Sequence, residues 1–392
     1  MPSRSGQPPR PTERPQPARP APSRRALLRG ATGALVGAAA LPALSACGYV
    51  SSAAQPDDLP PVEPKIDGDL VYFNWADYVD PAVLAGFSKE YGVSVTQANY
   101  DSMESMAAKI AAGNRYDVVF PSAKWTQRLV RAGALRRLDL RRAPHAGAVL
   151  SAYPWFADPW YDPGSAHSVP FTMYKTGIAW RKDKLGPALD HSWADLWDRR
   201  ATGRTYLLDD EDEVLGVGAL RLGYRVDTAD PGQLGRITDL MGTVRSRLRG
   251  FSSDDYTNLL NGDAWIQHMW SGDMAAVLSQ AADPSRYGFE APREGAPINS
   301  DCYAIPRNAA HPGTALLFID YMLRPENARR NLAYIGYPMP VPGTERDYAK
   351  LVEPFPECLV TLDDLARGHH FGNTGATGNQ ARDAAWTQIK AG

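Results

Sequence analysis

The chain has 392 residues, with 42 Lys and Arg, 44 Asp and Glu, and three Cys. Residues 1–46 carry seven Arg and one Glu, so the remaining chain holds 35 basic and 43 acidic residues, a net charge of -8. An acidic body argues against a nucleic-acid partner, which would need clustered Lys and Arg, and favours a cationic ligand. Its length of about 340 residues is natural for two domains.

Residues 1–46 are predicted to be an export signal. A basic, proline-rich leader precedes a Gly/Ala-rich apolar run over residues 30–46, which is short for a membrane-spanning helix and is interrupted by Pro42. The run ends in Leu-Ser-Ala before Cys47, the pattern of a bacterial lipoprotein signal. Cys47 is therefore predicted to be the lipid-bearing mature N-terminus. A plain secretory signal and an uncleaved membrane helix are the alternatives.

Two further features flank this signal. Residues 23–29 contain the pair Arg24-Arg25 and resemble a twin-arginine export signal, which would imply export of a folded protein. Residues 47–65 are polar and contain several prolines. They are predicted to be a flexible tether between the membrane and the folded protein.

Strands and helices alternate over residues 70–120. Strands are predicted at 70–74, 93–97 and 117–120. The first helix begins at Asp80-Pro81 and ends before Gly92, and the second presents one apolar face made of Met103, Met106, Ala107 and Ile110. This order predicts a parallel sheet covered by helices.

Aromatic and polar residues follow the first and third of these strands. Trp75, Asp77 and Tyr78 follow the first, and Ser122 and Lys124 follow the third. Ligands of parallel sheets bind beyond the carboxyl ends of the strands, so a binding site is expected here. The aromatic residues could instead be packing residues.

A second series of strands and helices follows. Ser192 is expected to cap a helix, and an acidic run fills residues 209–213, where a solvated surface is the alternative to a site. The expected strands are 177–180, 205–208, 265–270 and 301–306; the expected helices are 214–222, 313–322, 326–335 and one that ends the chain.

The sequence alone allows several interpretations of the chemistry of particular residues. Cys302 and Cys358 could form a disulfide outside the cytoplasm. A metal site could use His369 and His370, although adjacent histidines usually point apart. The chain has no nucleophile-elbow, phosphate-loop or zinc-helix motif. Asp210 and Glu213 could serve a glycoside hydrolase, but their close spacing disfavours opposed placement across a sugar.

From about Leu70 to its end the chain resembles the polyamine (spermidine/putrescine) substrate-binding proteins of ABC importers. The resemblance rests on the order and spacing of the segments 74–78, 116–119, 192–197, 209–210, 304–306 and 336–338. It implies an α/β, two-lobe periplasmic-binding-protein-like fold, with a hinge and a ligand cleft between the lobes. Residues 66–178 plus 299–342 would form the first lobe, and 179–298 plus 343–392 the second.

The resemblance further implies a non-enzymatic monomer that needs no cofactor or metal and delivers a cationic amine to permease subunits by hinge closure. The implied ligand-binding residues are Trp75, Asp77, Tyr78, Ser122, Lys124, Asp210, Glu213, Trp270, Asp301 and Tyr337. Carboxylates suit ammonium groups and aromatic faces suit a methylene chain.

The chain departs from the family pattern at three points. Lys124 and Asn299 stand where the family has aromatic residues, and the family's C-terminal glutamine has no clear counterpart near residues 369–371. Lys124 would repel ammonium groups if it pointed into the site. It must then point away or pair with a carboxylate, unless the ligand is shorter, less charged or partly acidic.

Overall fold

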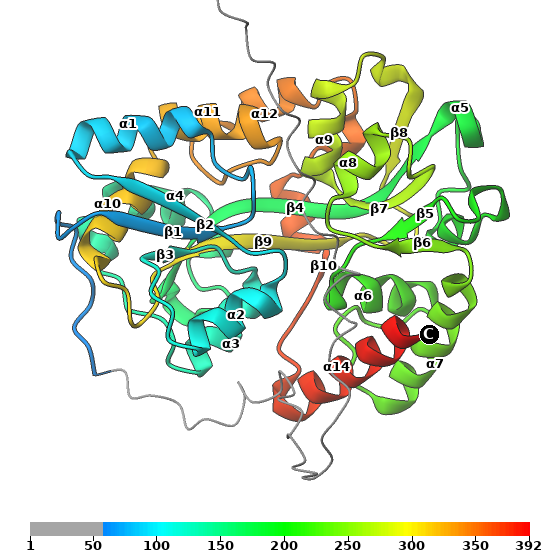
Figure 1. Ribbon diagram of the computed structural model, residues 1–392, viewed down its shortest axis with the longest axis horizontal. Coiled ribbons are helices and arrows are strands. Elements are labelled where there is room, and N and C mark those ends of the chain that lie inside the picture. Colours follow the sequence, from blue (N-terminus) through cyan, green and yellow to red (C-terminus); the bar gives the residue numbers. More distant parts are fainter. Residues whose placement is uncertain (1–57) are drawn as a thin grey trace, which may run out of the picture. The chain divides into compact units, whose positions relative to one another are not determined.

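The computed structural model describes residues 58–392, except for the side chains of Leu362, Ala366 and Arg367. The predicted export signal, Cys47 and most of the predicted tether lie outside the described residues. The elements form a mixed α/β fold of two lobes (Figure 1).

The first lobe is built around three parallel strands. β1 (Leu70–Asn74) lies between β2 (Val95–Asn99) and β3 (Val118–Val119) and pairs in parallel with both, as predicted. α1 (Pro81–Tyr91) and α2 (Met103–Ala111) connect them, and the four predicted apolar residues of α2 are all buried. β2 begins two residues later than expected, because Val93 packs into the core before pairing with β1 starts.

The second lobe is built around β5 (Thr205–Leu207), which pairs in parallel with β6 (Leu248–Phe251) and β7 (Ile266–Trp270). Its core joins α6 (Glu211–Arg221), α7 (Pro231–Arg245) and α14 (Gly375–Ala391) through Val214, Ile237 and Ile389. Ser192 caps its helix as expected, although residues 193–197 form a 3-10 helix.

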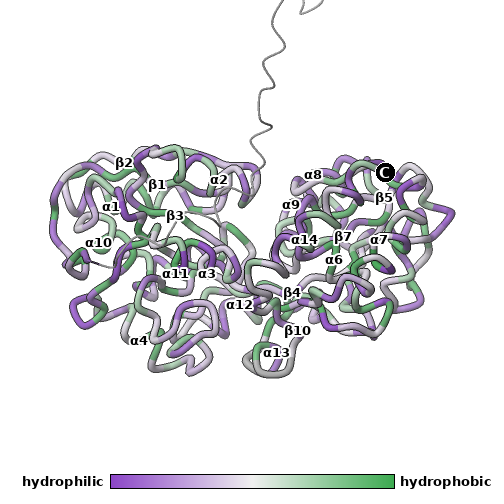
Figure 2. The backbone as a smooth tube through the Cα atoms, turned by 90° about the horizontal axis from the view of Figure 1, so that it is seen from below, coloured by the Kyte–Doolittle hydropathy of each residue, from purple (hydrophilic) through white to green (hydrophobic). Residues whose placement is uncertain are grey.

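Two long strands connect the lobes. β4 (Ser168–Arg181) pairs with β9 (Pro297–Ala304) through residue 175, and from Thr176 onward it pairs with β7 and β8 (Tyr287–Glu290). The strand expected at 177–180 is therefore too short. All fourteen residues of β4 are buried, so no polar alternation marked its start. Figure 2 shows the two groups of elements meeting around β4 and β10 (His369–His370).

Helices cover both lobes. α3 (Ala123–Arg131) follows β3 in the first lobe, and α9 (Ser271–Gln280) follows β7 in the second. The remaining helices are α4 (Pro144–Ala152), α5 (Lys182–Leu185), α8 (Asp255–Leu260), α10 (Pro312–Met322), α11 (Pro325–Ile335), α12 (Glu345–Leu351) and α13 (Leu362–Arg367). In residues 58–392 no helix is both long and apolar enough to span a bilayer.

The suggested disulfide is absent from the structure. Cys302 lies in β9 and Cys358 follows α12; both are buried and free. Nor do the adjacent histidines share a metal site, since His370 stacks on Trp155 at a centroid distance of 4.3 Å. Across the described residues, no group of three or more His, Cys, Asp or Glu could hold a metal ion.

Candidate functional site

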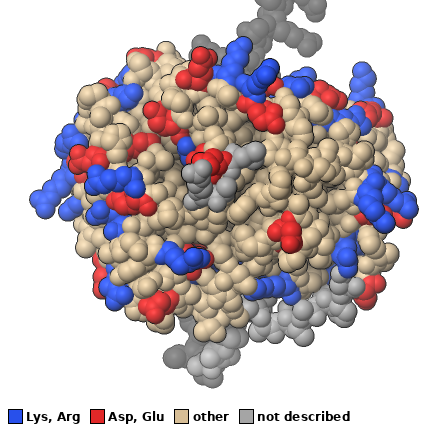
Figure 3. All heavy atoms as spheres, turned by 180° about the vertical axis from the view of Figure 1, so that it is seen from behind, with Lys and Arg blue, Asp and Glu red and all other residues tan. Residues whose placement is uncertain are grey.

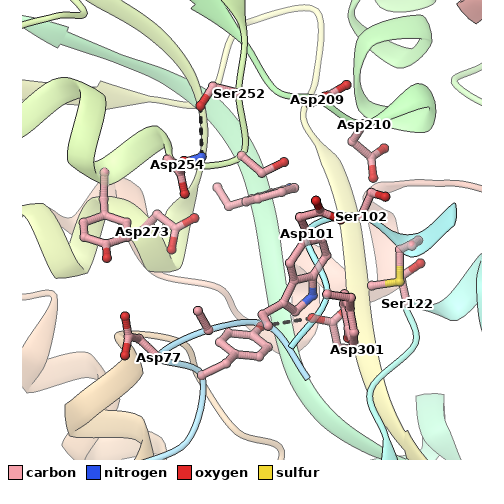
Figure 4. Close-up of a pocket in the computed structure, with 18 of the residues that line it drawn as sticks. Asp77, Asp101, Ser102, Ser122, Asp209, Asp210, Ser252, Asp254, Asp273 and Asp301 are labelled. Carbon is pink, nitrogen blue, oxygen red and sulfur yellow. Dashed lines mark hydrogen bonds between the residues drawn. The ribbon is translucent and has the colours of Figure 1, made fainter. Parts of the chain in front are cut away.

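A cavity of about 560 Å³ lies at the strand ends where the two lobes face each other. Figure 4 shows its labelled polar residues arranged around one central space. Of the ten residues expected in a ligand site, eight line this cavity: Trp75, Asp77, Tyr78, Ser122, Asp210, Trp270, Asp301 and Tyr337. Lys124 and Glu213 are not among its lining residues.

The loop after β1 supplies the first-lobe wall. Asp77 adopts a left-handed backbone conformation with φ of 52°, which is uncommon for a residue other than glycine. Trp75 packs edge-on against Tyr100 at 4.7 Å, and Tyr78 packs edge-on against Tyr337 at 5.3 Å. These ring contacts fix the aromatic surfaces that border the cavity.

Asp301 lies on β9 at the base of the cavity. Ser122, at the start of α3, forms a bridge to it across the sheet. The Tyr78 hydroxyl donates a hydrogen bond of 3.0 Å to Oδ2 of Asp301, while Oδ1 has no partner and the residue is only 4% exposed. Burial raises the pKa of Asp301 to about 7. The carboxylate is thus desolvated and has a free acceptor atom, which suits a cationic donor.

In the acidic run at residues 209–213 of the second lobe, some residues line the cavity and others hold neighbouring side chains in place. Asp210 caps α6 by accepting a hydrogen bond of 3.0 Å from the backbone of Glu213. Burial, followed by the negative charge of Asp212, raises the pKa of Asp210 to about 7. α6 begins three residues earlier than expected, because this cap lets the acidic residues form its first turn.

Glu213 supports an aromatic wall. Its Oε1 accepts a hydrogen bond of 3.2 Å from the indole nitrogen of Trp270, and the residue is 2% exposed. Burial and the neighbouring Asp210 hold the pKa of Glu213 well above its usual range. Glu213 was expected to contact the ligand; in this structure it does not line the cavity, and its Oε1 contacts Trp270.

Lys124 was also expected in the ligand site, and it does not line the cavity. Its ammonium lies 3.2 Å from Oε1 of Glu211 and also contacts the carboxylate of Asp212. The two carboxylates draw the side chain away from the cavity, and it is 4% exposed. Of the alternatives considered from sequence, pairing with a carboxylate is the one observed, so the lysine does not place a positive charge on the cavity wall.

Several lining residues were not expected. Tyr174 of β4 and Asp273 in the first turn of α9 border the cavity. Burial raises the pKa of Asp273 to about 6. Asp273 follows Trp270 by three residues next to a strand end, which is a usable signal, whereas Tyr174 lies in an unbroken apolar strand. The other unpredicted acids are Asp101, Asp209 and Asp254.

Charge on the cavity wall has one sign only. Seven of the lining residues are aspartates, and none of the described residues that line the cavity is Lys, Arg or His. The opposite face of the molecule differs, because acidic and basic side chains are interspersed there (Figure 3). The cavity therefore concentrates negative potential in a site flanked by aromatic rings.

A cavity at the strand ends between two α/β lobes is the arrangement of a solute-binding protein. Comparison with known proteins leads to the same class. Residues 82–350 match the family described as bacterial extracellular solute-binding protein, and the chain belongs to this family. The spermidine/putrescine-binding periplasmic protein of Salmonella typhimurium is 32% identical over 278 residues, which cover 70% of this chain and 78% of the relative.

Solved structures that are similar to this chain indicate the same class of protein. The lipoprotein Tp0655 (TpPotD) of Treponema pallidum has a TM-score of 0.71 and 26% identity, covering 82% of this chain and 99% of the other. A spermidine/putrescine ABC transporter substrate-binding protein, PotD of Streptococcus pneumoniae, has a TM-score of 0.64 and 26% identity, covering 83% and 99%. The family is a transport family and not an enzyme family, and its members act outside the cytoplasm.

Proposed function

We propose that the chain is the substrate-binding component of an ABC importer and captures a linear di- or polyamine between its lobes. The seven aspartates that line the cavity, without any lining base, are the observation that carries this proposal. A flexible ligand with several ammonium groups can reach acids on both lobes. The relatives are named for spermidine and putrescine, which supports the same class of ligand.

The proposed contacts divide into two kinds. Asp77, Asp210 and Asp301 would accept charge-assisted hydrogen bonds from ammonium groups, with Ser122 as a polar neighbour. The rings of Trp75, Tyr78, Trp270 and Tyr337 would contact the methylene chain and the cations. Glu213 would act through Trp270. Lys124 would act by joining the lobes.

Calorimetric titration tests the ligand class. Putrescine and spermidine should bind the full chain with one site per molecule, while glutamate, which has similar size and an excess of acid, should not bind. Binding of glutamate in preference to both amines would contradict the proposal. Absence of binding by every amine tested would do so as well.

The remaining parts of the proposal concern location and motion. We infer that the protein is a monomer tethered to the membrane by lipid at Cys47, and that it passes its ligand to permease subunits. The lobes would be residues 66–178 plus 299–342 and residues 179–298 plus 343–392, closing by a hinge on β4 and β9. The Treponema relative described as a lipoprotein supports such an anchor.

A further inference from the structure

His268 is a buried histidine directly behind the wall of the ligand cavity. It lies on β7 two residues before Trp270, and alternate residues of a strand point to the same face of a sheet. Trp270 borders the cavity, whereas His268 is 0% exposed and does not line it. Met269, between them, packs into a different core from the one that contains Ile266. His268 therefore belongs to the layer that supports the Trp270 ring.

The imidazole of His268 has no hydrogen bond at either ring nitrogen within the described residues. Trp193 packs edge-on against it at a centroid distance of 5.4 Å, but the indole nitrogen of Trp193 already donates to the carbonyl oxygen of Gly295. In this part of the chain, Glu213 has the one carboxyl group within 4.0 Å, measured from its Oε2 to Nε2 of His268. Buried polar groups are normally hydrogen-bonded, so Glu213 is the natural partner of this ring.

Glu213 has one unused carboxyl oxygen. Its Oε1 accepts a hydrogen bond from the indole nitrogen of Trp270, while Oε2 is buried and has no partner among the described residues. Burial and the negative charge of Asp210 hold the pKa of Glu213 well above its usual range, so the carboxyl group keeps its proton at neutral pH. Because Oε1 accepts from Trp270, the proton belongs on Oε2, the oxygen that faces His268.

The other groups that face this carboxyl group do not supply a positive charge. They are Asp210 and Asp212 of α6, Tyr174 of β4 and the hydroxyl of Thr176. The Thr176 hydroxyl is buried and has no hydrogen bond of its own. Hydrogen bonds between nitrogen and oxygen span about 2.7 to 3.2 Å, so a side-chain rotation that brings Oε2 about 1 Å closer to the imidazole would complete one.

We propose that His268 is a positioning residue of the amine site: the proton on Oε2 of Glu213 is shared with Nε2 of His268, and this neutral pair holds the indole of Trp270 in the cavity wall. The second proton of the imidazole then lies on Nδ1. Glu213 adds no net negative charge to the cavity, so ammonium groups are bound by the aspartates alone. The inference rests on the proposed function, since it concerns the same cavity.

Calorimetric titration of the full chain with putrescine tests the pair through substitutions of matched length. Glutamine reproduces a protonated glutamate, because its carbonyl group accepts from Trp270 and its amide donates to His268, whereas methionine does neither. Glu213→Gln should bind putrescine about fivefold more tightly than Glu213→Met, the equivalent of one net hydrogen bond. His268→Gln, which keeps an acceptor near the position of Nε2, should exceed His268→Met by a similar factor.

Two further comparisons separate this role from a general effect on the fold. In a Trp270→Phe background there is no indole nitrogen to hold, so His268→Gln and His268→Met should bind putrescine equally. Met269→Leu changes a buried residue of the same strand that packs in the other core, and it is the matched control. Its Kd for putrescine should equal that of the wild type.

Other outcomes would overturn the proposal. Equal affinity of Glu213→Gln and Glu213→Met would do so, as would a difference between the two His268 variants that persists without the Trp270 indole. If putrescine does not bind the wild type, the function proposed above fails, and thermal denaturation tests the pair by itself. The losses of Tm in Glu213→Met and His268→Met should then add to less than their sum in the double variant. Fully additive losses would refute the shared proton.

Discussion

Lys124 of the first lobe and Glu211 of the second form a buried ion pair, with 3.2 Å between Nζ and Oε1. Leu129 places α3 in the core around β1 and β3, whereas Val214 places α6 in the core of the second lobe. Arg382 of α14 contributes to the same cluster, 2.9 Å from Asp212. The ion pair thus joins two elements that have separate cores.

We expect Lys124→Met to loosen the joint between the lobes. Removing one partner of a buried pair leaves desolvated carboxylates and typically costs about 3 to 5 kcal/mol, a deficit that lobe separation would relieve by hydration. Ligand-free protein should then give a larger radius of gyration in X-ray scattering and bind amines more weakly. Lys89→Met, which removes an exposed lysine from α1, is the matched control. Superimposable scattering of Lys124→Met and wild type would refute this role.

Asp301→Asn should weaken amine binding by more than tenfold. Truncating one member of a desolvated charged contact costs roughly 2 to 5 kcal/mol, and about 1.4 kcal/mol corresponds to one decade in Kd. The asparagine amide can still receive the Tyr78 hydrogen bond, so the fold should persist. Calorimetry with putrescine measures the loss, and Tm serves as the folding check. Unchanged affinity would remove Asp301 from the proposed site.

Amine binding should strengthen as pH rises from 5 to 8. Burial raises the pKa of Asp301 and of Asp210 to about 7, so below that pH the ligand must displace protons. Titrations at pH 6.5 in buffers of different ionisation enthalpy should therefore show proton release on binding. A pH-independent Kd would contradict the assignment of these groups as ligand contacts.

The raised pKa values of Asp210 and Asp301 also determine how the free energy of unfolding of the ligand-free protein changes with pH. Each has a folded-state pKa above its usual value of 3.8, so the ligand-free folded state binds these protons more tightly than the unfolded state. Their contribution to the free energy of unfolding should be largest below pH 4 and be lost as pH rises to about 7. Chemical denaturation of wild type and Asp301→Asn should show a smaller loss over this window in the variant.

Cys47→Ser should release the protein from the membrane fraction without changing its Tm. The described core begins with Val62, so the lipid attachment point lies outside it. Fractionation with the wild type as control measures the change, and retention of the variant in the membrane would disprove anchoring at Cys47.

The twin-arginine prediction is separate, because Arg24→Lys with Arg25→Lys should block export if that route is used.

Sequence was informative where chemistry is local. The Asp80 and Gly92 caps bounded α1, and the apolar face of α2 was predicted residue by residue. Strand-end positions led to Trp75 and Asp77 in the cavity, whereas Asp301 was expected there only from the family resemblance. These predictions depend on neighbours within a few residues or on a general property of parallel sheets.

Long-range pairing could not be read from the sequence. Lys124 departs from the cavity because Glu211 and Asp212, some 90 residues later, attract it. Glu213 likewise contacts a residue far from it in the sequence, because its carboxylate accepts a hydrogen bond from Trp270. The two cysteines stay unpaired because each is buried among different neighbours. Tyr174 was hidden in a strand whose residues are uniformly buried.

The pairing of β4 with β9 has a consequence for the order in which the chain can fold. Tyr174 pairs with Asn299, and β9 also joins β3 through Ala304 and Val119, so the first-lobe sheet is completed by residues synthesised after most of the second lobe. Contacts between such distant segments form slowly. A nascent chain that stops before residue 297 would leave β3 and β4 with open edges, so the lobes cannot mature one after the other during synthesis. The molecule should fold only once about the last quarter of the chain is available, and until then the exposed edges would favour aggregation.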